Sequence, residues 1–210
     1  MISLYGGRDP RELPMYGLGE AAVFLRVPAS TLRAWVRGKD YRWRGQTKHM
    51  QRLIKADAGT GLLSFNNFVE AYVLASLTRQ FEVPLVRVRQ ALRYVGGERP
   101  LLTTVFKTDG QGIFVEQIED SLQRVDLDRA HRPLRLYPWR REPYEPKIVS
   151  IDPRRAFGRP TVVGRGIKID VIIDRHRAGE SVAQLSADYE LDGDVIEGVL
   201  RWGLDVAHAA

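Results

Sequence analysis

The amino-acid sequence predicts a mainly α-helical protein with small β-hairpins, and three observations support this fold class. Apolar residues recur at helical spacing between residues 19 and 95 and again between residues 170 and 202. Strand-like residues are confined to short runs beside turn-forming ones, as at residues 101–118. Cysteine is absent, which excludes disulfides, thiolate catalysis and zinc fingers, while a hydrophobic content of 44% supports a packed core.

The first predicted elements are two short helices joined by a tight turn in residues 16–38, YGLGEAAVFLRVPASTLRAWVRG. The first helix is expected at about residues 19–25, because Ala21, Ala22 and Leu25 share one face. Pro28 disfavours helix at the residue before it, so a second helix begins at residue 29 or 30 and ends near residue 37. Its outward side chains are expected to be Ser30, Thr31, Arg33 and Arg37.

This helix pair predicts a helix-turn-helix that contacts DNA. Short hydroxyls and arginines at the front of a second helix suit phosphate and base-edge contacts in a major groove. The open alternative is a helical hairpin that only packs in a core, but the arginines and the basic run that follows favour the DNA-binding interpretation.

A basic run with interleaved aromatic residues follows at residues 39–58 and predicts a β-hairpin wing. We expect one strand at residues 41–43, a return strand at residues 52–54 and a tip at residues 44–48 near the phosphate backbone. Phosphate contacts supply affinity and salt dependence but little sequence information. The cations of this run that are expected to contact DNA are Lys39, Arg42, Arg44, Lys48 and Arg52. The alternative is a mobile, solvated loop.

Two longer helices, a hairpin and a linker are expected next. Ser64 is a plausible N-cap for a helix at residues 63–81, and Pro84 begins a second one that ends before Gly96. Residues 101–118 carry a β-hairpin signal, and residues 133–146, with four prolines, predict an extended linker.

Residues 16–97 resemble the DNA-binding domain of MerR-like winged helix-turn-helix regulators. The matching residues are Glu20, Ala21, Ala22, Leu25, Val27, Thr31, Leu32, Arg33 and Trp35. The resemblance implies a winged helix-turn-helix domain in which a helix pair after the wing completes the fold.

The distribution of charge also separates this region from the rest. Residues 1–97 carry fifteen Lys and Arg against seven Asp and Glu, residues 98–147 carry nine against nine, and residues 148–210 carry eight against ten. The formal net charge of +6 therefore comes from the N-terminal half, as expected of a nucleic-acid-binding domain joined to a different one. A generally basic solvated surface would not predict this asymmetry.

The C-terminal region, residues 148–210, predicts three short helices at about residues 170–178, 181–189 and 192–202. It carries an Asp-Pro pair at residues 152–153 and the run FGRPTVVGRGI at residues 157–167. These motifs resemble a small helix-turn-helix family of unknown biochemical role, found in VapB-type antitoxins that are encoded beside PIN-domain ribonuclease toxins. The sequence departs from that family where Gly164, Arg165 and Gly166 replace the usual Gly-Thr-Arg.

Charge argues that this C-terminal tri-helical, helix-turn-helix-like domain does not read DNA. Its third helix begins with Asp192, Asp194 and Glu197, which phosphates would repel. We therefore expect a dimerisation or partner-binding domain. The expected organisation is a winged helix-turn-helix domain at residues 16–97, a hairpin and Pro-rich linker at 98–147, and the tri-helical domain at 148–210.

No catalytic constellation is recognisable, so no enzymatic activity, catalytic residue, metal or cofactor is expected. The four histidines, His49, His131, His176 and His208, are scattered without metal-ligand spacing. No apolar run approaches the ~18 residues that a membrane span needs. The first residues resemble neither a signal peptide nor a transit peptide, and we expect a cytoplasmic protein.

The two resemblances together imply an antitoxin of a type II toxin–antitoxin system. Such a protein would bind and neutralise a PIN-domain (VapC-like) endoribonuclease and, as a homodimer on double-stranded operator DNA, repress its own operon. The resemblance further implies that an arginine-bearing segment covers the acidic active site of the toxin, for which the linker offers Arg132, Arg135, Arg140 and Arg141. The alternative of equal weight is that these arginines only keep the linker soluble. The alternatives are a stand-alone MerR-like transcriptional regulator and a structural adaptor that does not bind DNA.

Overall fold

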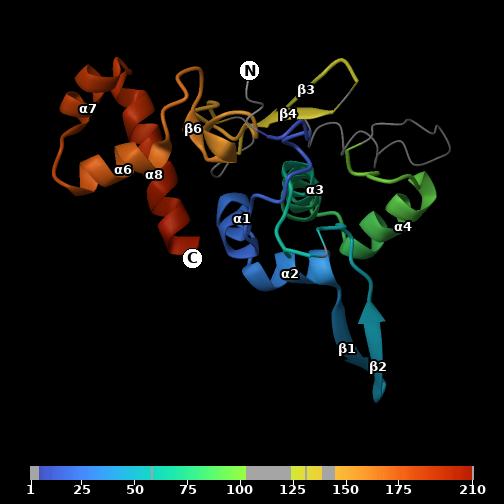
Figure 1. The fold of residues 1–210 in the computed structure, drawn as a ribbon. Coiled ribbons are helices and arrows are strands. Elements are labelled where there is room, and N and C mark those ends of the chain that lie inside the picture. The colour runs from blue at the N-terminus through green and yellow to red at the C-terminus, as the bar shows by residue number, and fades with distance from the viewer. Residues whose placement is uncertain (1–4, 58, 103–123, 131, 139–144, 210) are drawn as a thin grey trace. The chain divides into compact units, whose positions relative to one another are not determined.

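The computed structural model describes the whole chain except residues 1–4, 58, 103–123, 131, 139–144 and 210. The chain divides into two compact units, Met1–Leu134 and Arg135–Ala210. The fold is mainly α with small two-stranded antiparallel β-hairpins, as predicted (Figure 1). The division between the units falls inside the predicted linker. The predicted hairpin at residues 101–118 lies mostly outside the described residues.

Unit 1 is organised around one helix that is buried on every side. Its elements are α1 (Leu18–Leu25), α2 (Ala29–Arg37), β1 (Lys39–Trp43), β2 (Gln46–Met50), α3 (Phe65–Ala75), the π-helical turn η1 (Ser76–Gln80), α4 (Leu85–Val95) and β3 (Val125–Leu127). All residues of α3 are buried, and it lies behind α1 and α2 in Figure 1. Phe68 of α3 stacks on Tyr16 with ring centroids 5.0 Å apart. A helix that is buried on every side must lie in the interior of its domain.

Three polar residues of α3, Asn66, Asn67 and Glu70, are buried, and each has a bond to a distant part of unit 1. Ser64 caps the helix in a capping box with Asn67, as the N-cap prediction required. Glu70 lies in the core, where it accepts hydrogen bonds from Asn67 (3.0 Å) and from Arg99 (3.1 Å). Arg99 also pairs with Glu12 at 2.7 Å. These contacts join the segments before α1 and after α4 to the central helix.

Unit 2 is a small hairpin followed by three helices. The division between the units falls within β4 (Pro133–Leu136). The elements that follow are β5 (Val149–Ser150), the turn η2 (Ala156–Gly158), β6 (Thr161–Val162), α6 (Ile169–Arg177), α7 (Val182–Tyr189) and α8 (Gly193–Ala209). Ser181 caps α7 with a capping box through Gln184. Ile172, Leu185 and Ile196 supply the centre of the three-helix core. The third helix extends seven residues beyond the predicted end at residue 202.

Candidate nucleic-acid interface

The turn between α1 and α2 sets the direction of the second helix. Arg26 adopts a left-handed conformation, with φ 54°, and its N–H donates to the carbonyls of Ala22 and Val23. The N–H of Val27 donates to Ala22 O at 3.0 Å, and the Val27 side chain is buried. These bonds cap the end of α1. Pro28 then starts α2 in an extended conformation that its ring favours.

The second helix buries one face and exposes the face that was predicted to contact DNA. Leu32, Trp35 and Val36 are buried against the rest of unit 1. Ser30, Arg33 and Arg37 are exposed, while Thr31 is half-buried. The first turn of α2 carries neither an acidic residue nor a side-chain cap, so its N-terminal N–H groups remain suited to phosphate.

The wing is a two-stranded hairpin, but its return strand is not where the sequence predicted it. β1 pairs with β2 from Lys39 opposite Met50 to Trp43 opposite Gln46. Arg44 and Gly45, both with positive φ, form a two-residue turn of the kind that matches strand twist. The return strand is therefore Gln46–Met50, and the prediction of a strand at residues 52–54 and a longer tip at 44–48 is wrong.

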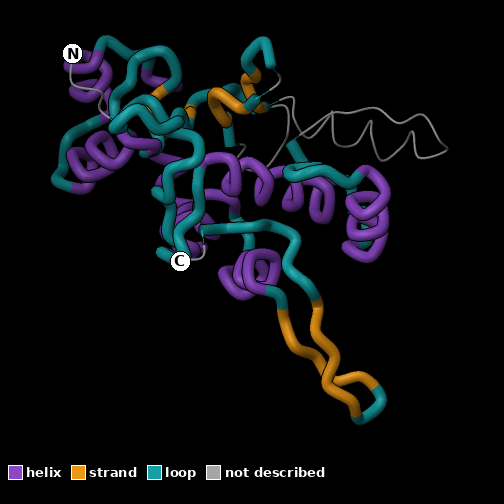
Figure 2. Tube along the Cα trace, turned by 45° about the vertical axis from the view of Figure 1, so that its right-hand side comes forward, coloured by secondary structure: helices purple, strands orange, loops and turns teal. Residues whose placement is uncertain are grey.

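Residues 52–54 instead anchor the hairpin to α2. The N–H groups of Leu53 and Ile54 both donate to Trp35 O, at 2.7 and 3.0 Å. At the other end, Gly38 joins α2 to β1 with φ 83°, and a Cβ there would lie 2.6 Å from Met50 O. Only glycine fits this close approach. The hairpin is thus tied to α2 at both of its strands (Figure 2).

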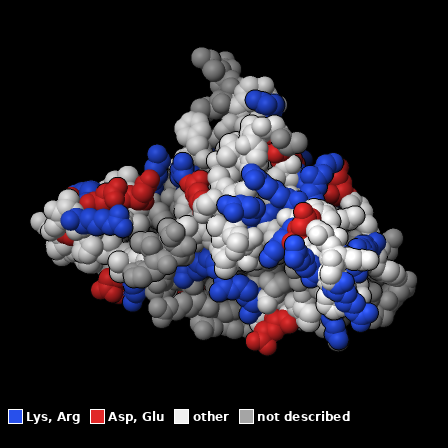
Figure 3. Space-filling model, turned by 90° about the horizontal axis from the view of Figure 1, so that it is seen from below, with Lys and Arg blue, Asp and Glu red and all other residues white. Residues whose placement is uncertain are grey.

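The hairpin is solvent-exposed on both faces from Lys39 to His49. The five predicted cations, Lys39, Arg42, Arg44, Lys48 and Arg52, are all exposed. Within the described part of the chain, none of the five forms an ion pair. By contrast, Arg11, Arg99 and Arg175 are each bound by two carboxylates. Figure 3 views the side toward which the hairpin projects, where basic side chains outnumber acidic ones. Unpaired surface cations of this kind are available to phosphates.

Two of the arginines predicted to bind a toxin are already bonded inside the chain. Arg132 donates to Asp128 at 2.8 Å, and Asp128 also accepts from the backbone N–H groups of Ala130 and Arg132. The pKa of Asp128 is held well below its usual range by these hydrogen bonds, the one from the Arg132 backbone first. Arg140 and Arg141 lie outside the described residues.

Arg135 is committed to a buried carboxylate in unit 2. It donates to Tyr137 Oη at 3.1 Å and lies 3.5 Å from Asp152, which is almost fully buried. Arg154 donates to the same carboxylate. Burial raises the pKa of Asp152, but the hydrogen bonds from Arg154 and the charges of both arginines outweigh it and lower that pKa. The four toxin-binding arginines stay a prediction, and Arg135 has a structural contact that the sequence did not reveal.

The sequence reasoning missed an exposed aromatic turn in unit 2. Ala156, Phe157 and Gly158 have φ of 47°, 52° and 73°, so three successive residues lie in the left-handed region. That region is costly for residues other than glycine. Phe157 is 64% exposed and stands between the exposed Arg155 and Arg159. No local sequence signal other than Gly158 marks this turn.

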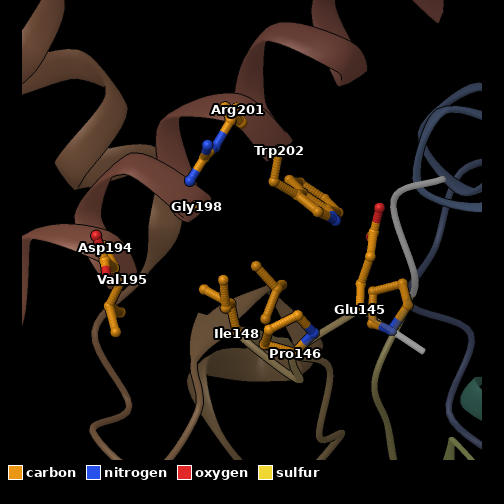
Figure 4. A pocket seen from close by; sticks show the side chains of 10 residues that line it. Glu145, Pro146, Ile148, Asp194, Val195, Gly198, Arg201 and Trp202 are labelled. Atoms are coloured by element: carbon orange, nitrogen blue, oxygen red, sulfur yellow. The ribbon is translucent and has the colours of Figure 1, made fainter. Parts of the chain in front are cut away.

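A hollow of about 440 Å³ lies between α8 and the segment before β5 in unit 2 (Figure 4). Trp202 and Arg201 border it on α8, and Pro146 and Ile148 border it opposite. Gly198 lets Ile148 approach α8, since a Cβ there would lie 2.3 Å from Ile148 Cδ1. None of the predicted site residues that the structure describes lines this hollow.

Among the described residues, no three or more His, Cys, Asp or Glu side chains form a cluster that would hold a metal ion. Within the same residues, no helix has both the length and the apolar character needed to cross a membrane.

Known families match the two regions separately. Residues 14–92 match a family described as "Putative DNA-binding HTH domain", and residues 149–202 match DUF433, a family of unknown function. The first match covers α1, α2, the hairpin, α3 and most of α4. It indicates a helix-turn-helix domain, in agreement with the geometry. The MerR-like assignment remains a prediction.

Similar proteins span nearly the whole chain. "Putative antitoxin VapB45" of Mycobacterium tuberculosis (strain ATCC 25618 / H37Rv) is 26% identical over 90% of this chain and 93% of its own length. "Uncharacterized protein Rv2308" of the same strain is 28% identical over 90% and 89%. The crystal structure of Rv2018 from M. tuberculosis superposes with a TM-score of 0.66 at 21% identity, covering 90% of this chain and 98% of that one. The last likeness shows a shared fold.

Proposed function

We propose that this protein is a DNA-binding antitoxin that represses its own operon and neutralises a PIN-domain endoribonuclease. The observation that carries the DNA-binding part is the continuous exposed surface of α2 and its hairpin. That surface presents Arg33 and Arg37 of α2, Lys39, Arg44 and Lys48 of the hairpin, and Arg52 beyond it, without ion pairs to described residues. We also propose that the protein is not an enzyme and that it is located in the cytoplasm.

In the proposed complex, α2 and the hairpin contact different parts of the DNA. Arg33 and Ser30, on the exposed face of α2, would meet base edges and phosphates in a major groove. Arg44 at the hairpin tip and Arg52 beyond β2 would meet phosphates. A homodimer would place two such units on a palindromic operator, because the symmetry of a dimer is matched by that of its site.

Fluorescence anisotropy with labelled duplexes tests this part. The wild-type chain should bind the DNA upstream of its own gene more tightly than a random duplex of equal length. Affinity for both should fall steeply with salt. Binding that shows no salt dependence on either duplex would overturn the proposal and favour the adaptor alternative.

The toxin-neutralising part is supported by the similarity to a protein named "Putative antitoxin VapB45" over nine-tenths of the chain. Arg132 and Arg135 are engaged with Asp128 and Asp152, so Arg140 and Arg141 are the linker arginines we propose for the acidic site of a toxin. Arginine recognises carboxylates through two parallel hydrogen bonds, and a PIN-domain active site supplies carboxylates.

Co-purification with the product of the neighbouring gene, followed by a ribonuclease assay, tests the toxin part. A stable complex in which the chain silences a ribonuclease is expected. The double variant Arg140→Ala and Arg141→Ala should relieve inhibition, while Arg129→Ala, an exposed arginine elsewhere, should not. If the double variant inhibits fully, the linker is not the inhibitory segment. If no partner binds, the chain is a stand-alone regulator.

A further inference from the structure

The register of the hairpin gives it two faces of different chemistry. Successive side chains of a strand point to opposite faces, and residues paired across two strands point to the same face. Every second residue of β1 therefore shares one face with its partner in β2. One face therefore holds Lys39, Tyr41 and Trp43 of β1 with Gln46, Lys48 and Met50 of β2. The other face holds Asp40 and Arg42 with Thr47 and His49. We name these the aromatic face and the Asp40 face.

Charge distinguishes the two faces. Asp40 is the one acidic residue between Lys39 and Arg52. It lies on the Asp40 face opposite His49, and its Oδ1 is 2.6 Å from His49 Nδ1. A carboxylate turned toward a phosphate backbone would be repelled. The aromatic face contains Lys39 and Lys48 and no acidic residue. Only the aromatic face is therefore complementary to DNA along its whole length.

The aromatic side chains of the hairpin have no role in the core of unit 1. Trp43 is 54% exposed and Tyr41 is 39% exposed, although large aromatic side chains usually bury their surface. A two-stranded ribbon has no layer of its own to cover them. The Arg44 guanidinium lies 5.9 Å from the Trp43 ring centroid, so ring and cation are presented together.

The hairpin is also held in a constant direction relative to the proposed recognition helix. Gly38 and the two N–H bonds from Leu53 and Ile54 to Trp35 O fasten both of its strands to the end of α2. A surface that meets DNA through α2 thus continues into one face of the hairpin.

We propose that the aromatic face lies against the DNA duplex, with Trp43 packed on the sugars and base edges of the groove beside the one that α2 enters. This inference rests on the proposed DNA binding and adds which side of the hairpin makes the contact. Lys48 then meets a phosphate, and the Asp40 face, including Arg42, points away from the duplex.

Two matched pairs of variants test the orientation, each pair comparing opposite faces. Lys48→Ala should lower the slope of log affinity against log salt by about 1, and Arg42→Ala should leave the slope unchanged. Trp43→Ala should weaken binding to both specific and random duplexes roughly 10-fold with an unchanged slope, because an apolar contact releases no counterions. Thr47→Ala should stay within about twofold of the wild type.

The opposite pattern, in which Arg42→Ala flattens the salt slope and Trp43→Ala has no effect, overturns the orientation while leaving DNA binding intact. Trp43→Phe keeps an apolar ring and should lose less than about threefold, which separates the contact from a folding defect. If Trp43→Ala changed the oligomeric mass and not DNA affinity, the face would be a contact between copies, and the inference would fail. A wild-type chain without salt-dependent binding would instead refute the proposed function.

Discussion

The two helix-turn-helix regions of the chain share one backbone design and present opposite charges. In unit 1, α1 ends at Leu25 and α2 begins at Ala29; in unit 2, α7 ends at Tyr189 and α8 begins at Gly193. Each turn begins with a left-handed residue, Arg26 in one and Glu190 in the other. In both turns, the N–H of the following residue donates a hydrogen bond to the carbonyl five residues before it, from Val27 to Ala22 O and from Leu191 to Ser186 O.

The second helices correspond position by position. Leu32 of α2 and Ile196 of α8 occupy equivalent positions, and both are fully buried. Trp35 and Val199 also occupy equivalent positions, and both are buried. On the exposed face, Arg33 corresponds to Glu197. Ser30 corresponds to Asp194 in the same way. The apolar positions thus determine the motif, whereas the exposed positions determine what it can bind, because phosphates accept the first face and repel the second.

The most direct test of this difference replaces Arg33 and its counterpart Glu197, each by alanine. Arg33→Ala should cost roughly 1–3 kcal/mol on the specific site and much less on random DNA, since a base-edge contact is lost. Glu197→Ala, its counterpart, should leave DNA affinity within about twofold. Anisotropy on both duplexes measures this. Equal losses on specific and random DNA for Arg33→Ala would place that side chain on a phosphate.

The buried carboxylates of the two units should respond oppositely to acid. Burial raises the pKa of Glu70 to about 7, against the attraction of Arg99. The folded state therefore binds a proton that the unfolded state releases between pH 7 and about 4.5, so unfolding free energy should rise by about 2 kcal/mol from pH 7 to pH 5. Asp152, with its lowered pKa, stabilises above about pH 4 and loses that contribution only below it.

Urea unfolding followed by circular dichroism at pH 7 and pH 5 checks this sign. The variant Glu70→Gln should remove the rise, while Asp152→Asn should leave it in place. The charged groups that face Glu70 are Arg99, which pairs with it, and Glu12, which pairs with the same arginine. An equal rise in Glu70→Gln would mean that another group takes up the proton.

The acidic front of α8 provides the next test. Replacing Asp192, Asp194 and Glu197 together by alanine should weaken self-association or partner binding roughly 10-fold, because complementary charge is lost from a contact surface. Operator affinity should not change. Sedimentation and anisotropy, performed on the same sample, separate the two effects. If association stayed intact and operator affinity changed, unit 2 would be a second DNA reader after all.

The smallest expected effect concerns the left-handed turn of unit 2. Ala156→Gly should stabilise the chain by about 1 kcal/mol, since glycine adopts positive φ at little cost. Ala183→Gly, in the exposed face of α7, should destabilise it by a similar amount. Thermal unfolding compares the two variants. Destabilisation by Ala156→Gly would show that the Ala156 methyl group makes a contact worth more than the strain.

Most helices were predictable because their signals are local. Pro28 and Pro84 marked helix starts, and Ser64 and Ser181 marked caps that the structure realises as capping boxes. The return strand of the wing was not predictable, since every residue from Gln46 to His49 is polar or charged and exposed. Without apolar alternation, a strand pattern has no signal. Arg44 in a turn that normally prefers Asn or Asp concealed the two-residue loop.

The sequence by itself determined the helical elements, the position of the helix-turn-helix and the charge of each region, because these depend on neighbouring residues. The tertiary structure decided which side chains share a face. It separated Lys48 from Arg42 across the hairpin through strand register. It also paired Arg135 with Asp152, seventeen residues away, beside an isolated β-bridge between Leu136 and Ile151 that no local pattern specifies. Contacts between distant residues depend on how the whole chain packs, and that information is not contained in any one segment.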